Sequence, residues 1–127
     1  MKALIDIFSY REVITPKAQG YFIGNYKCHV NCLSYFTEHK EDVKHIVGCL
    51  QVFSDNDTAA HFILELNDGT FIDPTWGNMI DLYSCCIPIE KYDPAKFNPN
   101  RELANLKAYF HGLLPWYLRL INKKGNM

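Results

Sequence analysis

The sequence predicts an α+β fold in which a helix packs on a small antiparallel β-sheet of at least three strands. Three observations lead to this class. Apolar residues recur at helical spacing over residues 28–39. Residues 43–53 and 60–76 are instead rich in β-branched and aromatic residues bounded by turn signals. The chain therefore runs helix, strand, hairpin and then helices, an order that favours an α+β domain over alternating βαβ units.

Length and composition are typical of one globular domain. The chain has 127 residues, enough for one hydrophobic core but not for two, so residues 1–127 are assigned to a single domain. A hydrophobic content of 48% excludes an intrinsically disordered chain. The net charge of −1 gives no electrostatic basis for binding nucleic acid or an anionic membrane, and no apolar run has the length of a membrane span.

The N-terminus and the cysteines indicate a cytoplasmic protein. Asp6 comes too early for the apolar core of a signal peptide. Five cysteines are an odd number, and without a secretion signal we expect them to be reduced thiols. No pattern in the sequence indicates an oligomeric state.

The first predicted element with a clear period is a helix that begins near Cys28. Residues 1–15 fit a short strand or a short helix, and residues 16–25 contain two glycines and are predicted to be loop. The residues that recur at helical spacing after this loop are Cys28, Cys32, Tyr35, Phe36 and His39. Cys28 therefore falls in the first turn of the helix.

A strand at 43–53 and a polar turn at 54–58 precede the predicted hairpin at 60–76, whose two arms are joined by Asn-Asp-Gly. Proline residues at three positions divide the segment after residue 77, which predicts irregular chain there. A final helix is expected to start at Asn98 or Asn100. Its apolar stripe consists of Leu103, Leu106, Phe110, Leu113 and Leu114, and Pro115 should break or kink it.

The register of the hairpin decides whether His61 and Asp73 meet. A two-residue turn pairs Leu64 with Asp73 and places His61 on the opposite face. A three-residue turn pairs Ile63 with Asp73, so that His61 and Asp73 are diagonal neighbours on one face. We expect the three-residue turn because Gly69 then occupies the position that requires positive φ.

Cys28 has the expected position of an activated nucleophile. The positive end of the helix dipole and unpaired N–H groups favour a thiolate there and can help to hold an oxyanion. Cys32 lies one turn deeper on the same face and is expected in the core. His29 points about 100° around the helix from Cys28, so His61 is the better base.

Asp73 completes the constellation, because Pro74 holds it extended at the end of its strand, where it can orient His61. Each residue also has an ordinary structural explanation, as a buried free cysteine, a half-exposed strand histidine or an Asp-Pro turn. Together, in the order Cys28, His61, Asp73, they predict a catalytic triad.

Residues 27–31, 60–64 and 68–76 resemble the transglutaminase-like, papain-like cysteine superfamily, over roughly residues 24–77 of the chain. The resemblance implies a papain-like core with Cys28 as nucleophile, His61 as base and Asp73 as the orienting carboxylate. Members of this superfamily include peptidases, amidases, deamidases, acyltransferases and inactive binders. A papain-type enzyme also has an oxyanion glutamine shortly before its cysteine. Here the candidates are Gln19, nine residues upstream, and Asn25, three residues upstream.

Zinc binding is the competing chemistry, since Cys28 and Cys32 could share a metal with His61 or with the Cys85-Cys86 pair. That spacing is unusual for structural zinc, and the signature of zinc deaminases is absent. We therefore expect no metal and no cofactor.

The predicted function is cysteine-dependent transfer or hydrolysis of an amide or ester, in a protein or a small molecule. The alternative is a catalytically inactive binding or inhibitory module of the same fold, such as a phage- or effector-type protein.

Overall fold

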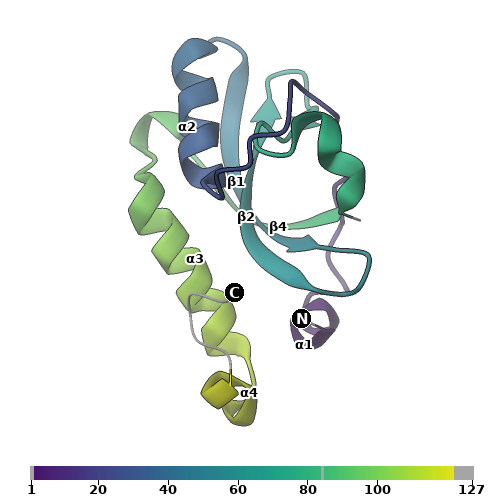
Figure 1. Cartoon of the computed structure of the whole chain (residues 1–127). Coiled ribbons are helices and arrows are strands. Elements are labelled where there is room, and N and C mark those ends of the chain that lie inside the picture. The colour runs from purple at the N-terminus through teal and green to yellow at the C-terminus, as the bar shows by residue number, and fades with distance from the viewer. Residues whose placement is uncertain (1, 84, 122–127) are drawn as a thin grey trace.

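A four-stranded antiparallel sheet organises the chain, in the strand order β3-β2-β1-β4 (Figure 1). The computed structural model describes residues 2–83 and 85–121. The strands are β1 (Val43–Val52), β2 (Thr58–Leu66), β3 (Phe71–Ile72) and β4 (Cys85–Tyr92). The helices are α1 (Lys2–Ile7), α2 (Cys28–Glu38), α3 (Pro99–Leu113) and α4 (Trp116–Ile121), with 3₁₀ turns η1 (Gly77–Leu82) and η2 (Pro94–Lys96). The predicted α+β class is confirmed.

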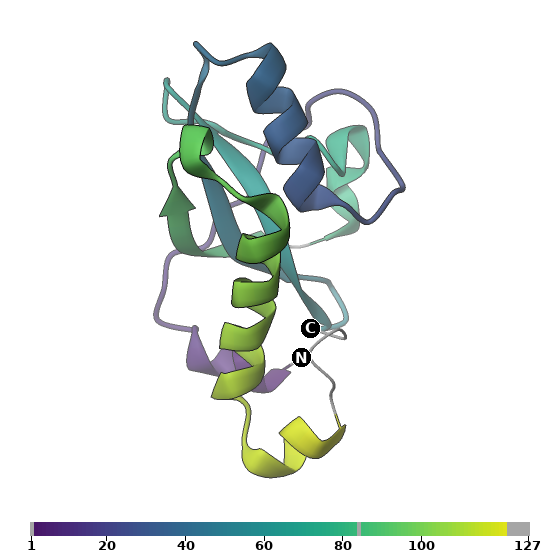
Figure 2. The ribbon, with the colours of Figure 1, turned by 90° about the vertical axis from the view of Figure 1, so that its left-hand side faces the viewer.

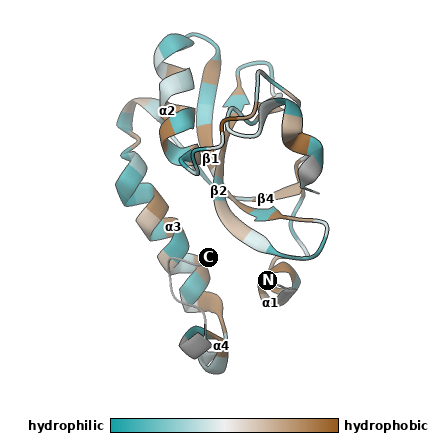
Figure 3. Cartoon of the chain, in the orientation of Figure 1, coloured by the Kyte–Doolittle hydropathy of each residue, from teal (hydrophilic) through white to brown (hydrophobic). Residues whose placement is uncertain are grey.

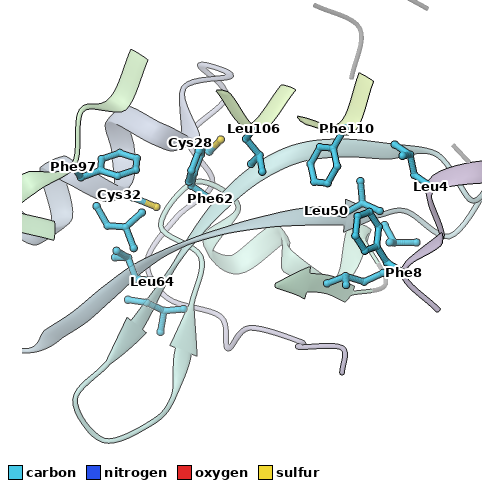
Figure 4. Packing of buried hydrophobic residues seen from close by; sticks show 14 of the residues in the cluster. Leu4, Phe8, Cys28, Cys32, Leu50, Phe62, Leu64, Phe97, Leu106 and Phe110 are labelled. Atoms are coloured by element: carbon cyan, nitrogen blue, oxygen red, sulfur yellow. The ribbon is translucent and has the colours of Figure 1, made fainter. Parts of the chain in front are cut away.

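Each face of the sheet has its own core. Helices α2 and α3 cover one face, as the turned view in Figure 2 shows. The side chains of Leu106 and Phe110 point from α3 toward the sheet, where Leu50, Phe62 and Leu64 are buried (Figure 4). Along α3 hydrophobic residues are spaced between hydrophilic ones, as expected of a helix with one buried side (Figure 3). The opposite face carries a smaller cluster: Val47, Cys49, Ile63, Ile80, Tyr83 and Cys86.

The β2–β3 hairpin has the predicted three-residue turn. Leu64 pairs with Ile72, and the N–H of Leu66 donates to the carbonyl of Thr70 at 2.8 Å. Gly69 has φ of 86°, the left-handed conformation that a glycine adopts without steric cost. Because side chains alternate along a strand, this register places His61 and Asp73 on the same face.

Strand β4 was not expected, because Pro88 lies within it and the sequence predicted irregular chain. The strand is at the edge of the sheet, where a residue without an N–H group is tolerated. The register also shifts between Gly48 and Cys49, next to the position where Cys49 pairs with Pro88. The bulge and the edge position together explain how a proline fits into this strand.

The helical predictions agree with the structure at both ends. Helix α2 begins at Cys28, α3 begins directly after Asn98, and Pro115 separates α3 from α4. The side chain of Asn98 accepts from the N–H of Arg101, which is a helix cap. Within residues 2–83 and 85–121, none of the helices has the length and apolar character needed to cross a membrane.

Candidate active site

His61 and Asp73 form a buried pair on the face of the sheet that carries the smaller cluster. His61 Nε2 lies 2.7 Å from Asp73 Oδ2, with the residues 3% and 0% exposed. The hydroxyl of Tyr83 donates to the same carboxylate oxygen at 2.6 Å. The other oxygen, Oδ1, accepts from the N–H groups of Thr75 and Trp76 at 2.9 and 3.0 Å. With all these donors around it, the carboxylate holds one position and fixes the imidazole ring.

Burial alone would raise the pKa of Asp73, but the charge of His61 and these hydrogen bonds outweigh it and lower the pKa below its usual value. Burial would likewise lower the pKa of His61. The negative charges of Cys28 and Asp73 and hydrogen bonds to both outweigh that effect, so the pKa of His61 is raised well above its usual value. These charges and hydrogen bonds therefore favour the protonated form of the imidazole ring.

Cys28 lies at the first residue of α2, beside Phe62 of β2 (Figure 4). Strand β3 ends at Ile72, so it pairs with β2 only as far as Leu64 and leaves the backbone of Phe62 open at this edge. The N–H group of Phe62 is therefore available to the Cys28 sulfur. Because Nε2 of His61 is bound to Asp73, Nδ1 is the ring nitrogen that remains for the thiol.

The pKa of Cys28 is lowered to about 6, although burial alone would raise it. The charge of His61, hydrogen bonds with His29 and His61, and the backbone of Phe62 outweigh the desolvation. His29 was not expected to act on the neighbouring residue, yet its buried ring contributes to the stability of the thiolate. The two shifts therefore favour the thiolate of Cys28 and the protonated form of His61.

Cys32 has the opposite character. It is 0% exposed, and burial, followed by the negative charges of Cys28, Asp73 and Cys86, raises its pKa well above the usual value. This thiol is a packed core residue, as its deeper position in the helix predicted.

Asn31 and Thr75 connect the first turn of α2 to the segment after Asp73. The side-chain amide of Asn31 donates to Thr75 Oγ1 at 3.0 Å and exchanges two hydrogen bonds with the side chain of Asn25, at 3.0 and 3.1 Å. These bonds fix the helix that carries Cys28 against the turn that carries Asp73. The sequence analysis missed both residues. Their positions, three residues after the cysteine and two after the aspartate, were the available signal.

Cys28 and His61 both line a cavity of about 310 Å³. Its apolar lining includes Phe22, Ile23, Phe53, Ala59, Ala60 and Trp76. The polar residues in the cavity wall include Gln51, which the sequence analysis did not identify. Gln51 lies in β1 and is brought to the site only by the pairing of β1 with β2.

The two residues predicted as oxyanion donors lie elsewhere. Gln19 is exposed and lines a separate cavity of about 320 Å³, next to Asn31. The side chain of Asn25 is bonded to Asn31 and to the N–H of Lys27. Neither residue lines the cavity that contains Cys28, so the geometry gives no support to either as the donor.

Among residues 2–83 and 85–121, no three His, Cys, Asp or Glu side chains are placed so that they could hold a metal ion. Cys86, one of the candidate zinc ligands, is packed in the smaller cluster.

Comparisons with known proteins identify no family for this chain. No protein-family model matches it, and neither the curated proteins nor the solved structures include a significant match. The geometry of the site is therefore the basis for assigning a function.

Proposed function

We propose that this protein is a thiol enzyme that transfers or hydrolyses the acyl group of an amide or ester, with Cys28 as nucleophile, His61 as proton carrier and Asp73 as the orienting carboxylate. The observation that carries the proposal is the buried arrangement in which Asp73 binds His61 at 2.7 Å and His61 in turn lowers the pKa of Cys28 to about 6. Buried ionised groups are unfavourable unless paired, and such arrangements gather at active sites. The papain-like character of the core is part of this proposal.

The reaction follows from the protonation states. The Cys28 thiolate attacks the carbonyl carbon and forms a C–S bond, while the carbonyl oxygen takes up the electron pair. His61 gives its proton to the leaving nitrogen or oxygen as the C–N or C–O bond breaks. Water or an amine then loses a proton to His61 and attacks the thioester, which releases the acyl group and restores the thiolate. The N–H groups of the first turn of α2, which have no partner within the helix, are the donors we expect to stabilise the oxyanion.

The proposal includes a cytoplasmic location. All of the cysteines are free in the structure, as expected of a protein in a reducing compartment.

The test is selective alkylation of Cys28 by iodoacetamide at mildly acidic pH. We expect Cys28 to be labelled while Cys85 is not, because burial and the neighbouring Cys86 raise the pKa of the partly exposed Cys85. His61→Ala should remove this selectivity. The matched control His45→Ala alters a histidine of β1 that binds Glu65 at 2.7 Å outside the site, and it should leave labelling unchanged.

Mass spectrometry after incubation with a p-nitrophenyl ester should then find an acyl group on Cys28 of the wild type and none on Cys28→Ala. If labelling instead follows exposure alone and no acyl adduct forms, the protein is the inactive binding or inhibitory module of the alternative interpretation.

A further inference from the structure

Gln51 is a buried polar residue whose side-chain nitrogen, Nε2, has no hydrogen-bond partner within the described chain. It lies in β1 directly opposite Ala59 of β2, on the same face as His61. The residue is 3% exposed. An unpaired buried amide of this kind destabilises a fold by roughly 1–3 kcal/mol. A donor kept at this cost in the wall of the cavity that contains Cys28 indicates a ligand that accepts from it.

The remainder of the cavity wall is apolar and aromatic. The rings of Phe22 and Phe53 lie 5.4 and 5.9 Å from that of Trp76, which holds these side chains together at one side of the cavity. None of the described residues that line the cavity is Asp, Glu, Lys or Arg. A volume of about 310 Å³ is at the lower end for small-molecule sites and fits one acyl group better than an extended ligand.

We propose that this cavity binds an uncharged acyl group with an aromatic or branched aliphatic body, and that Gln51 Nε2 donates to its carbonyl oxygen. The proposal rests on the proposed function in naming the ligand an acyl group, because Cys28 lies in the same wall. A carboxylate would lose its hydration in this cavity, where the protonated His61 is already paired with the Cys28 thiolate and Asp73 and no lysine or arginine is present. An amide carbonyl needs one donor, which Gln51 supplies.

The experiment measures binding of two probes by NMR titration of the wild-type chain and of Cys28→Ala. Phenylacetamide has an aromatic body and one uncharged carbonyl group, and phenylacetate is its anionic counterpart. We expect phenylacetamide to bind the wild type at least roughly tenfold more tightly than phenylacetate, because His61 is already paired with two anions. Cys28→Ala should still bind phenylacetamide, with a smaller preference over phenylacetate because His61 has lost one of its anions.

Gln51→Leu separates a ligand-binding role from a structural one. We expect this variant to bind phenylacetamide roughly fivefold more weakly, the usual effect of one lost hydrogen bond. Its Tm should be unchanged or higher, because the substitution removes an unpaired buried amide. Asn105→Leu is the matched control, since Asn105 lines a different cavity, beside α3, and its replacement should leave binding unchanged.

Three results would overturn the inference: no binding of phenylacetamide, equal binding of phenylacetate by the wild type, or unchanged binding by Gln51→Leu, and a lower Tm of that variant would assign Gln51 a structural role. Its failure is distinguishable from that of the proposed function. Binding of phenylacetamide needs no thiol chemistry, whereas alkylation and acylation of Cys28 need no particular acyl group.

Discussion

Cys28 and Cys32 lie one helical turn apart on the same face of α2, and their pKa values are shifted in opposite directions. Both thiols are desolvated. Only Cys28 has a positive charge beside it, from His61, and only Cys28 lies at the open edge of β2 where a backbone donor is free. Local charge and hydrogen bonding therefore outweigh burial at one cysteine, and burial prevails at the other.

We predict that alkylation of Cys28 by iodoacetamide follows a single apparent pKa of about 6 and is then constant toward neutral pH. His61→Ala should move this pKa above the usual thiol value of 9.0, because desolvation would remain without its main opposing charge. The measurement is the alkylation rate as a function of pH. A rate at one pH is less informative, since the nucleophilicity of a thiolate falls with its pKa.

Cys85 is the internal reference for this profile. Its pKa is raised, so its alkylation should increase only toward alkaline pH. Parallel profiles for Cys28 and Cys85 would contradict an ionised Cys28–His61 pair.

At the scale of elements, hydrogen bonds hold the helix and the hairpin in the relation that the site requires. Asn31 of α2 binds Thr75, and Thr75 donates its own N–H to Asp73. Cys28 and Asp73 are thus connected through a short chain of polar contacts as well as through His61.

We predict that Asn31→Ala weakens this connection. It leaves Asn25 and Thr75 without their partner, so the free energy of unfolding should fall by about 1–3 kcal/mol. The alkylation pKa of Cys28 should also rise, because the first turn of α2 is no longer held beside His61. Thermal unfolding and the alkylation profile measure the two effects.

Thr37→Ala is the control, since it removes a hydroxyl from the exposed side of the same helix, where Thr37 bonds only to the carbonyl of Leu33. A loss of stability in Asn31→Ala with an unchanged Cys28 pKa would show that Asn31 supports the fold but does not position the thiol.

The elements that the sequence predicted are those with strong local signals. Gly69 specified the turn and therefore the register that brings His61 and Asp73 together. Helix α2 begins at Cys28, the first of the residues that recur at helical spacing. Strand β4 was missed because Pro88 is a local signal against a strand, and only the edge position and the bulge at Ile89 of β4 make it acceptable.

The residues of the site that the sequence did not reveal are those whose role depends on distant pairing. Gln51 enters the cavity because β1 pairs with β2, and Tyr83 reaches Asp73 from the far end of η1. No spacing along the chain encodes these contacts. By contrast, Gln19 and Asn25 were selected by closeness in sequence to Cys28, and their side chains lie elsewhere.

On the scale of the whole molecule, the site straddles the edge of the sheet. Cys28 belongs to the core that α2 and α3 cover, whereas His61 lies on the face with Ile63 and Tyr83. The two meet because β3 ends at Ile72 and leaves the edge of β2 open. Folding of both cores is thus required before the pair exists.

This dependence connects the ionisation of the pair to global stability. The lowered pKa of Cys28 contributes stability that is fully present above pH 9.0, the pKa of an ordinary thiol, and is lost as the pH falls toward about 6. The raised pKa of His61 contributes stability that is fully present below pH 6.5, the pKa of an ordinary histidine, and is lost as the pH rises toward the pKa of His61 in the folded state. Between pH 6.5 and pH 9.0 the contributions of Cys28 and His61 to the free energy of unfolding change with pH in opposite directions and cancel. The reason is that folding moves one proton from the cysteine to the histidine and releases none.

We therefore predict that the pair's contribution to the free energy of unfolding is constant to within about 1 kcal/mol from about pH 5 to about pH 9, and falls at higher pH. The measurement is urea unfolding across this range for the wild type and for a non-titrating reference with Cys28→Ser, His61→Gln and Asp73→Asn, whose difference isolates the pair. If Cys28 and His61 were instead both neutral in the folded state, the unfolded chain would bind an extra proton on the histidine below 6.5. The difference would then decrease as the pH falls from about 6.5 to about 5, and that slope would exclude the thiolate–imidazolium pair on which the proposed chemistry depends.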